Sequence, residues 1–164
     1  MIATDPEKIL KIMDQMAGLE MKVAEFYRTC AENREKDFWS EMEKDEVHHA
    51  ANLRRMATLF SAKPELFEVN RVFQIPAIHT ALGGVQEVIE KIHSNQLERN
   101  KILFIARDIE QSLLEVRYGE LFRSKDMEFQ KLVRELQSQT RAHKSRIEKK
   151  IQEVQNGSRD FKPV

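Results

Sequence analysis

A glutamate and a histidine interrupt an otherwise apolar helical stripe in segment 37–61. Alternating steps of three and four residues, the spacing of one helix face, give Trp39, Met42, Glu46, His49, Leu53, Met56 and Phe60. Side chains three residues apart on a helix share a face, so Glu46 and His49 can hold the same metal ion. For this pair alone, a solvated polar face or a Glu46–His49 hydrogen bond is the alternative. A buried carboxylate is costly unless it is paired, protonated or bound to a metal.

Three further segments carry the same kind of stripe, and each is interrupted near its middle. They are 6–33 with Glu20, 96–124 with Glu110, and 126–155 with Thr140 and His143. A short link near residue 35 makes the first two helices antiparallel neighbours, with Glu20 and Glu46 at similar heights. Chance would rarely place ligand-type residues at matching depths on four helices. The repetition therefore favours a metal site over four unrelated core-edge residues.

The composition predicts an all-α fold. Helix-favouring residues dominate, only five Gly and four Pro occur among 164 residues, and strand signals are nearly absent. Thr4 or Asp5 is the expected N-cap of the first helix, followed by Pro6. Residues 62–79 are expected to form an irregular connection that crosses from one end of a bundle to the other, and 80–93 a short extra helix. One domain over 1–155 and a polar tail over 156–164 complete this organisation.

Charge and cysteine content argue against several classes of protein. The 27 basic and 27 acidic residues give a formal net charge of zero without a basic face, so nothing indicates nucleic-acid binding. The single cysteine, Cys30, excludes a disulfide framework or a paired Cys-x-x-Cys metal module within this sequence, and reads as a small buried hydrophobe. The sequence has no signal-peptide pattern and no membrane-spanning run of about 20 apolar residues. We therefore expect a cytoplasmic protein without a membrane or nucleic-acid partner.

Several short motifs together resemble one known family. They are Glu20 followed by Phe26-Tyr27, Glu46-x-x-His49 followed by Ala50 and Leu53, Glu110 followed by Tyr118, and His143 on the last helix. Over roughly residues 5–155 the chain resembles the rubrerythrin-like branch of the ferritin-like di-iron carboxylate superfamily. The resemblance implies a ferritin-like four-helix bundle in which the first helix pair crosses over to the second. It also implies two iron ions in the core, with manganese or zinc as alternatives, and peroxide-reducing, iron-oxidising or iron-storing activity.

The resemblance also assigns roles to individual residues. Glu20 would be a terminal ligand of one iron, His49 would bind that same iron, and Glu46 would bridge the two. Glu110 and His143 would serve the second iron. Tyr27 and Tyr118 would either hydrogen-bond a ligand carboxylate or be core aromatic residues.

One position departs from the family pattern, because Thr140 stands where the second bridging glutamate is expected. Three glutamates then face two cations, and a neutral hydroxyl is a poor ligand for a hard cation. Water, hydroxide or a small anion could fill the gap, one metal could bind weakly, or the redox chemistry could be lost. Glu43 and Glu135 are remote candidates to replace the missing carboxylate.

Two functions follow from this pattern. The first is a non-haem iron protein that reduces peroxide or oxidises ferrous iron, with an external electron donor where one is needed and a homodimer as its expected assembly. The second is a non-catalytic helical interaction or structural protein whose vestigial site binds one metal or none. Metal content separates them.

Overall fold

The computed structural model describes residues 5–33, 35–69, 75–116 and 122–157. These residues are mostly helical, as the composition predicts. The helices are α1 (Pro6–Asn33), α2 (Lys36–Ala62), α3 (Ile75–His93), α4 (Arg99–Val116) and α6 (Met127–Gly157). A single 3-10 turn, η1 (Pro64–Leu66), and two short strands, β1 (Phe67–Val69) and β2 (Phe122–Ser124), make up the remaining regular structure of the described residues.

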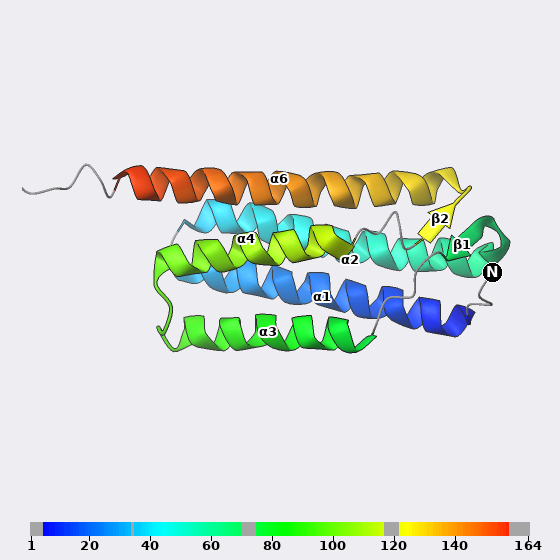
Figure 1. The fold of residues 1–164 in the computed structure, drawn as a ribbon, viewed down its shortest axis with the longest axis horizontal. Helices are drawn as coiled ribbons and strands as arrows, with labels where there is room; N and C mark the ends of the chain where they lie inside the picture. The colour runs from blue at the N-terminus through cyan, green and yellow to red at the C-terminus, as the bar shows by residue number, and fades with distance from the viewer. Residues whose placement is uncertain (1–4, 34, 70–74, 117–121, 158–164) are drawn as a thin grey trace, which may run out of the picture.

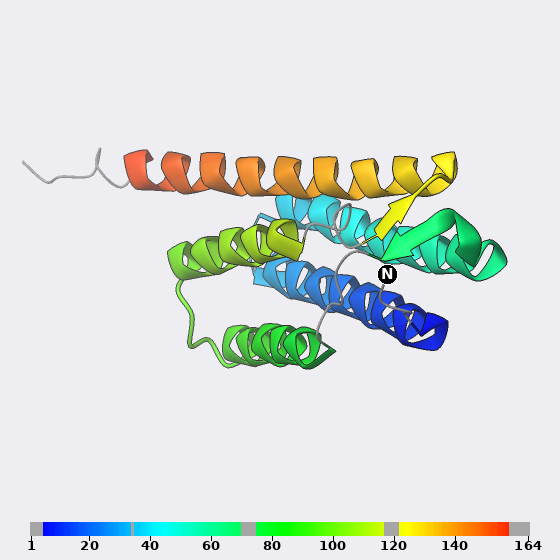
Figure 2. The same cartoon turned by 45° about the vertical axis from the view of Figure 1, so that its right-hand side comes forward.

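The long helices lie side by side along the long axis of the molecule (Figure 1). Helix α1 packs along α2 and α3, while α6 packs along α4 and α2. In Figures 1 and 2, α3 lies at one edge and α6 at the other, with α1, α2 and α4 between them. Figure 1 also shows that α2 and α4 run in the same direction, because α3 carries the chain back between them. The connection that returns the chain from the end of α2 to the start of α4 is therefore made largely by helix α3.

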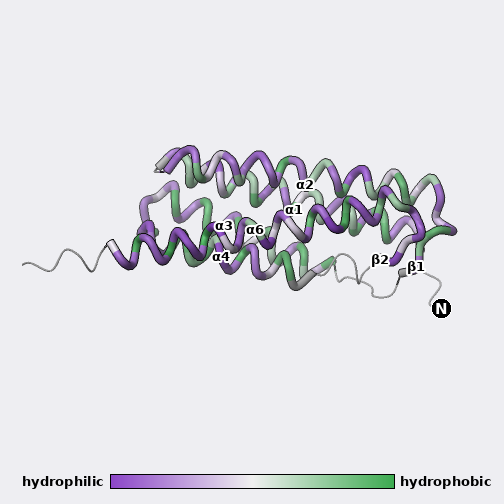
Figure 3. The backbone as a smooth tube through the Cα atoms, turned by 90° about the horizontal axis from the view of Figure 1, so that it is seen from above, coloured by the Kyte–Doolittle hydropathy of each residue, from purple (hydrophilic) through white to green (hydrophobic). Residues whose placement is uncertain are grey.

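Side chains from the neighbouring helices fill a common core. Hydrophobic and hydrophilic residues alternate along the helices (Figure 3), as the stripes in the sequence predict. The largest fully buried residues come from all five described helices and include Tyr27 of α1, Met42 of α2, Ile89 of α3, Leu103 of α4 and Phe129 of α6. Burial of such apolar surface is the main term that stabilises the bundle.

Aspartate side chains cap two of the helices. The Asp5 carboxylate accepts a hydrogen bond from the Glu7 amide at 3.0 Å, which confirms Asp5 as the cap of α1. Thr4, the alternative cap, lies outside the described residues. The Asp126 carboxylate accepts a bond from the Phe129 amide at 2.9 Å at the start of α6. Each cap satisfies an amide that the helix itself leaves free.

The connections differ from the sequence expectation in two places. Residues 62–79 are not wholly irregular, since β1 lies within them and α3 begins at Ile75, five residues earlier than expected. The third core helix was expected to run to Ser124, which is wrong because residues 122–124 form β2. Strand β2 pairs antiparallel with β1, with Glu68 opposite Arg123. This pairing joins segments 55 residues apart in the sequence, so local periodicity does not predict it.

Polar pairs join α2 to α6 over much of their length. The Arg146 guanidinium contacts Glu41 at 2.6 Å, and the Arg55 guanidinium contacts Glu128 at 2.7 Å nearer the other end. Between them, His48 lies 3.0 Å from Glu135. Most of these side chains are substantially exposed, so each pair contributes little to stability by itself. Together they mark the alignment of the two helices around the centre of the bundle.

Candidate metal centre

Glu20, Glu46 and His49 form one buried group between α1 and α2. The three side chains expose 1%, 0% and 0% of their surface. One potential ligand atom from each residue lies within 4.8 Å of the other two. The two helices are antiparallel, and this brings Glu20 and Glu46 to the same height, as the sequence predicts.

Glu46, Glu110 and His143 form a second buried group that brings in α4 and α6. Their potential ligand atoms also lie within 4.8 Å of one another, and Glu110 and His143 are almost completely buried. Glu46 belongs to both groups. All five predicted ligand residues therefore converge in the interior, from four helices, around one shared carboxylate.

Both histidines direct the same ring nitrogen at the shared carboxylate. Nδ1 of His49 lies 2.9 Å from one oxygen of Glu46, and Nδ1 of His143 lies 2.8 Å from the other. The two rings are stacked with centroids 5.7 Å apart. Nδ1 of His143 also lies 3.5 Å from Glu110. In this arrangement each Nδ1–H donates to a carboxylate.

The other ring nitrogen of each histidine contacts a residue on the opposite helix. Nε2 of His49 on α2 lies 2.7 Å from the amide oxygen of Gln139 on α6. Nε2 of His143 on α6 lies 3.0 Å from a carboxylate oxygen of Asp45 on α2. The Asp45 carboxylate can only accept, so Nε2 of His143 donates to it, and in this arrangement the amide oxygen of Gln139 accepts from Nε2 of His49.

Tyr27 supports the second group from α1. Its hydroxyl donates a hydrogen bond to the Glu110 carboxylate, one of the two roles expected for Tyr27, while the role of Glu110 as a ligand stays a prediction. The phenol ring stacks against Trp39, with centroids 5.6 Å apart, and is fully buried. Burial raises the pKa of Tyr27 well above its usual value, and the charge of Glu110 raises it further. The phenol therefore remains a hydrogen-bond donor.

The charged groups of the cluster shift one another's pKa values. Burial alone would raise the pKa of Glu46, but the hydrogen bonds from His143 and His49 lower it to about 2. Burial alone would lower the pKa of His143, but contacts with Glu110 and Glu46 raise it to about 11. The pKa of His49 is also raised, because Glu46 outweighs the effect of burial. Glu46 is therefore an ionised carboxylate whose charge is stabilised by the histidines on either side of it.

Glu110 lacks the same compensation. Burial and the nearby charge of Glu46 raise its pKa to about 7, despite the opposing contacts with His143 and Tyr27. One of its oxygens, Oε2, is buried and has no hydrogen-bond partner among the described residues. A cation next to this buried oxygen would stabilise the ionised carboxylate, because no hydrogen-bond donor in the described part of the chain contacts that oxygen. Carboxylate oxygens and imidazole nitrogens also suit iron, manganese and zinc, so the residues present fit a divalent metal.

Thr140 occupies the position where the resemblance places a second bridging glutamate. It is buried, and its hydroxyl donates to the Leu136 carbonyl at 2.8 Å. The two remote substitutes lie outside the cluster, since Glu43 accepts from Arg28 at 3.0 Å and Glu135 contacts His48. The cluster therefore contains three carboxylates, as the sequence predicts.

Asp45 and Gln139 are the site residues that sequence reasoning missed. Each lies one position before a stripe residue, Glu46 and Thr140 respectively, and so about 100° away from the stripe around its helix. Their polar type carried no signal in a sequence where charged residues are common. Their matching positions in the two halves of the apparent repeat could have suggested a shared role. Tyr118, the other tyrosine expected near the ligands, lies outside the described residues.

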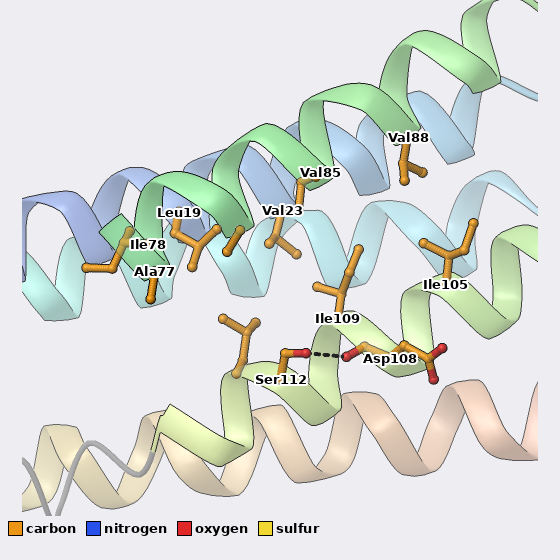
Figure 4. A pocket seen from close by; sticks show the side chains of 13 residues that line it. Leu19, Val23, Ala77, Ile78, Val85, Val88, Ile105, Asp108, Ile109 and Ser112 are labelled. Carbon is orange, nitrogen blue, oxygen red and sulfur yellow. Dashed lines mark hydrogen bonds between the residues drawn. The ribbon is translucent and has the colours of Figure 1, made fainter. Parts of the chain in front are cut away.

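An apolar cleft of about 410 Å³ opens between α1, α3 and α4 (Figure 4). Its lining is almost entirely aliphatic and includes Leu19, Val85 and Ile109. Leu19 and Ile109 directly precede Glu20 and Glu110, so the helix segments that carry two of the candidate ligand carboxylates also form walls of this cleft. Cys30 lies elsewhere, is buried, and has its thiol pKa raised by burial, which agrees with a core role.

Comparisons with protein-family models, with curated proteins and with solved structures found no match to this chain. Within the described ranges, no helix is both long and apolar enough to cross a membrane. Support for a function therefore comes from the geometry of the buried cluster.

Proposed function

We propose that this chain is a non-haem metal protein of the rubrerythrin-like type, which binds two iron ions and reduces peroxide or oxidises ferrous iron. One observation carries the proposal: five buried ligand-type residues from four helices converge in two groups that share Glu46. Isolated buried carboxylates are rare, and three of them in one core require positive charge. Two divalent cations would supply it.

The side chains are arranged so that cations can replace protons. Nδ1 of each histidine faces the carboxylates, and its proton occupies the side from which a cation would bind. Loss of that proton leaves Nε2–H donating to Gln139 or Asp45, so each ring keeps its orientation. Glu46 has one oxygen toward each histidine and would bridge the two positions. Glu20 and Glu110 would complete the ligands on either side.

A bound iron pair would supply two electrons for the reduction of a peroxide or dioxygen. The protein would contribute fixed ligands, a buried site and the Tyr27 hydroxyl hydrogen-bonded to Glu110. The external electron donor and the homodimer expected from the sequence stay predictions.

Thr140 supports a second candidate function. With a neutral residue at the second bridging position, the cluster could be a vestigial site that holds one metal ion or none, within an interaction or structural protein that performs no redox reaction. The two candidates share the fold and differ in metal stoichiometry and in reactivity.

Metal analysis of the purified protein tests the first candidate. The protein would be purified without chelator and its metal content measured per chain. It would then be loaded anaerobically with ferrous iron and exposed to peroxide. About two irons per chain, with the near-ultraviolet absorption of a coupled ferric pair, are expected. One metal without this absorption would favour the second candidate. No binding after iron loading would exclude the first candidate and leave the second, as a protein whose site binds no metal.

A matched pair of variants ties the result to the cluster. Glu46→Gln removes the shared charge and is expected to abolish binding of at least one metal. Glu43→Gln changes a carboxylate on the same helix that pairs with Arg28 outside the cluster. It is expected to leave the stoichiometry unchanged. Equal loss in both variants would contradict the assignment of the site.

A further inference from the structure

The two histidines are held by partners of different charge. Asp45 and Gln139 are the acceptors for Nε2 of His143 and His49, at 3.0 and 2.7 Å. The arrangement is reciprocal, because α2 supplies the partner for the histidine of α6 and α6 supplies the partner for the histidine of α2. One partner is a carboxylate, and the other is an amide.

This difference affects how strictly each histidine is oriented. A carboxylate can only accept, so Asp45 requires a proton on Nε2 of His143 and leaves Nδ1 available for a cation. An amide has an accepting and a donating end, so Gln139 can rotate and is a less strict partner for His49. A charged acceptor also makes the imidazole a stronger electron donor to a metal. The Asp45 side chain is 41% exposed and so avoids most of the desolvation cost of a buried charge.

The negative charge around the two potential metal-binding groups is also unequal, and it is again greater around His143 than around His49. Glu46 is common to both. The group of His143 adds Glu110 and, behind the ring, Asp45, whereas the group of His49 adds Glu20 and the neutral Gln139. A divalent cation therefore meets one more negative charge near His143 than near His49.

We propose that Asp45 and Gln139 are positioning residues that make the two metal positions unequal, so that the position formed by Glu46, Glu110 and His143 fills first. This inference rests on the proposed function and deepens it, since it predicts an order of binding within the cluster. Metal analysis of the wild-type protein alone would not establish that order. Thr140 does not create it, because a bridging residue would have served both positions.

A cobalt titration tests the inference. Co²⁺ would be added to the metal-free protein under argon, with binding followed by the visible absorption of the bound ion and by calorimetry. Two resolved steps are expected in the wild-type protein. Glu110→Gln should weaken the first step and Glu20→Gln the second, which assigns each step to its position.

Two reciprocal variants test the role of the partners. Asp45→Asn keeps the size of the side chain, and it should weaken the first step by about 10- to 100-fold and change the absorption of the first equivalent. Gln139→Glu should strengthen the second step and bring the two constants together. Glu135→Gln is the control, because it alters a similar contact between α2 and α6 at the exposed His48. It should leave both steps unchanged.

The outcomes separate this inference from the proposed function. Binding in two steps that Asp45→Asn leaves unchanged, or weakens equally, would overturn the inference alone. A single bound Co²⁺ that Asp45→Asn weakens and Gln139→Glu does not would support it. No Co²⁺ binding by the wild-type protein would overturn both. Far-ultraviolet circular dichroism of each variant checks that it is folded.

Discussion

Glu46 is the residue on which the interior depends most. It is completely buried, it contacts histidines from two helices, and it belongs to both potential metal-binding groups. Its ionised state is stabilised by those histidines rather than by solvent, since their hydrogen bonds reverse the effect of burial on its pKa. Substitutions at neighbouring positions, such as Thr140 and Tyr27, leave Glu46 and its two histidines in place. Their effects on metal binding or stability can therefore be assigned to the substituted side chain.

Thr140→Glu should restore a fourth carboxylate. We expect the metal stoichiometry to reach two per chain, with at least about tenfold tighter binding of the weaker metal, because an added negative charge neutralises a hard cation. The metal-free variant should be less stable than the wild type, since it buries another carboxylate. Metal titration and thermal melts with and without metal measure both effects.

Thr140→Val is the control for that variant. It removes the hydroxyl that bonds to the Leu136 carbonyl but adds no charge. Metal binding should stay at the wild-type level. Unchanged binding in Thr140→Glu would contradict the interpretation of this position as a missing ligand.

Tyr27→Phe should destabilise the metal-free protein by about 1–3 kcal/mol at pH 8, because a buried carboxylate loses a donor while the stacked ring is kept. The loss should be smaller at pH 5, where Glu110 is protonated. Urea unfolding at the two pH values measures this difference. A loss that is the same at both would indicate that Tyr27 acts only through packing.

At the scale of elements, the sequence predicted the parts of the fold that depend on local periodicity. Helices α1, α2 and α6 have nearly the expected bounds, since long stripes with caps define them. The same stripes identified all five candidate ligands, because a charged residue in an apolar stripe is visible without a structure. The contacts of Asp45 and Gln139 were not predictable in this way, since they depend on the alignment of α2 against α6.

The errors in the connections have separate physical causes. Pro76 was interpreted as part of an irregular segment, yet it is the second residue of α3, where a missing amide proton costs nothing. The short helix expected over 80–93 is present as the C-terminal part of α3, which continues through Gly83 and Gly84. The strands β1 and β2 are three residues long and are stabilised by a partner far away in sequence. Local patterns carry no signal for such pairing.

Phe67→Ala tests whether the strand pair stabilises the end of the bundle. Phe67 on β1 packs edge-on against Phe60 of α2 and Phe129 of α6. We expect a loss of about 2 kcal/mol in the free energy of unfolding, which is below the cost for a fully buried phenylalanine. Thermal and urea unfolding measure the loss. Glu68→Ala, an exposed neighbour on the same strand, should cost little, and equal effects would contradict the packing role.

For the whole molecule, the formal charge is zero while three carboxylates are gathered in the interior. Without metal, the folded state keeps protons on groups that release them when the chain unfolds. Folding, proton binding and metal binding are therefore linked.

The stability of the chelator-treated protein should fall as the pH rises from 5 to 8. The folded pKa of Glu110 is about 7 against an ordinary value of 4.5, so its contribution is present below 4.5 and is lost as the pH rises through 7. This shift corresponds to about 3 kcal/mol. The raised pKa of His143 acts in the same direction above 6.5. Urea unfolding at several pH values measures the slope.

Glu110→Gln should flatten this pH dependence, because the glutamine is neutral throughout. Added divalent metal should reverse the slope in the wild-type protein, since metal ions compete with protons for the same ligands. A wild-type slope that remains after the substitution would assign the effect to other groups.

The polar contacts between α2 and α6 also have a consequence for how the chain finds its native alignment. Glu41 with Arg146, Asp45 with His143, His49 with Gln139, and Arg55 with Glu128 pair in strict antiparallel succession. A shift of one helix past the other by a single turn, about 5.4 Å, would separate all of these partners at once. It would also leave the buried imidazoles of His49 and His143 without hydrogen-bond partners in the apolar core. Apolar stripes tolerate such slippage far better. The polar pairs between α2 and α6 therefore also select the correct alignment of the two helices over alignments shifted by one turn.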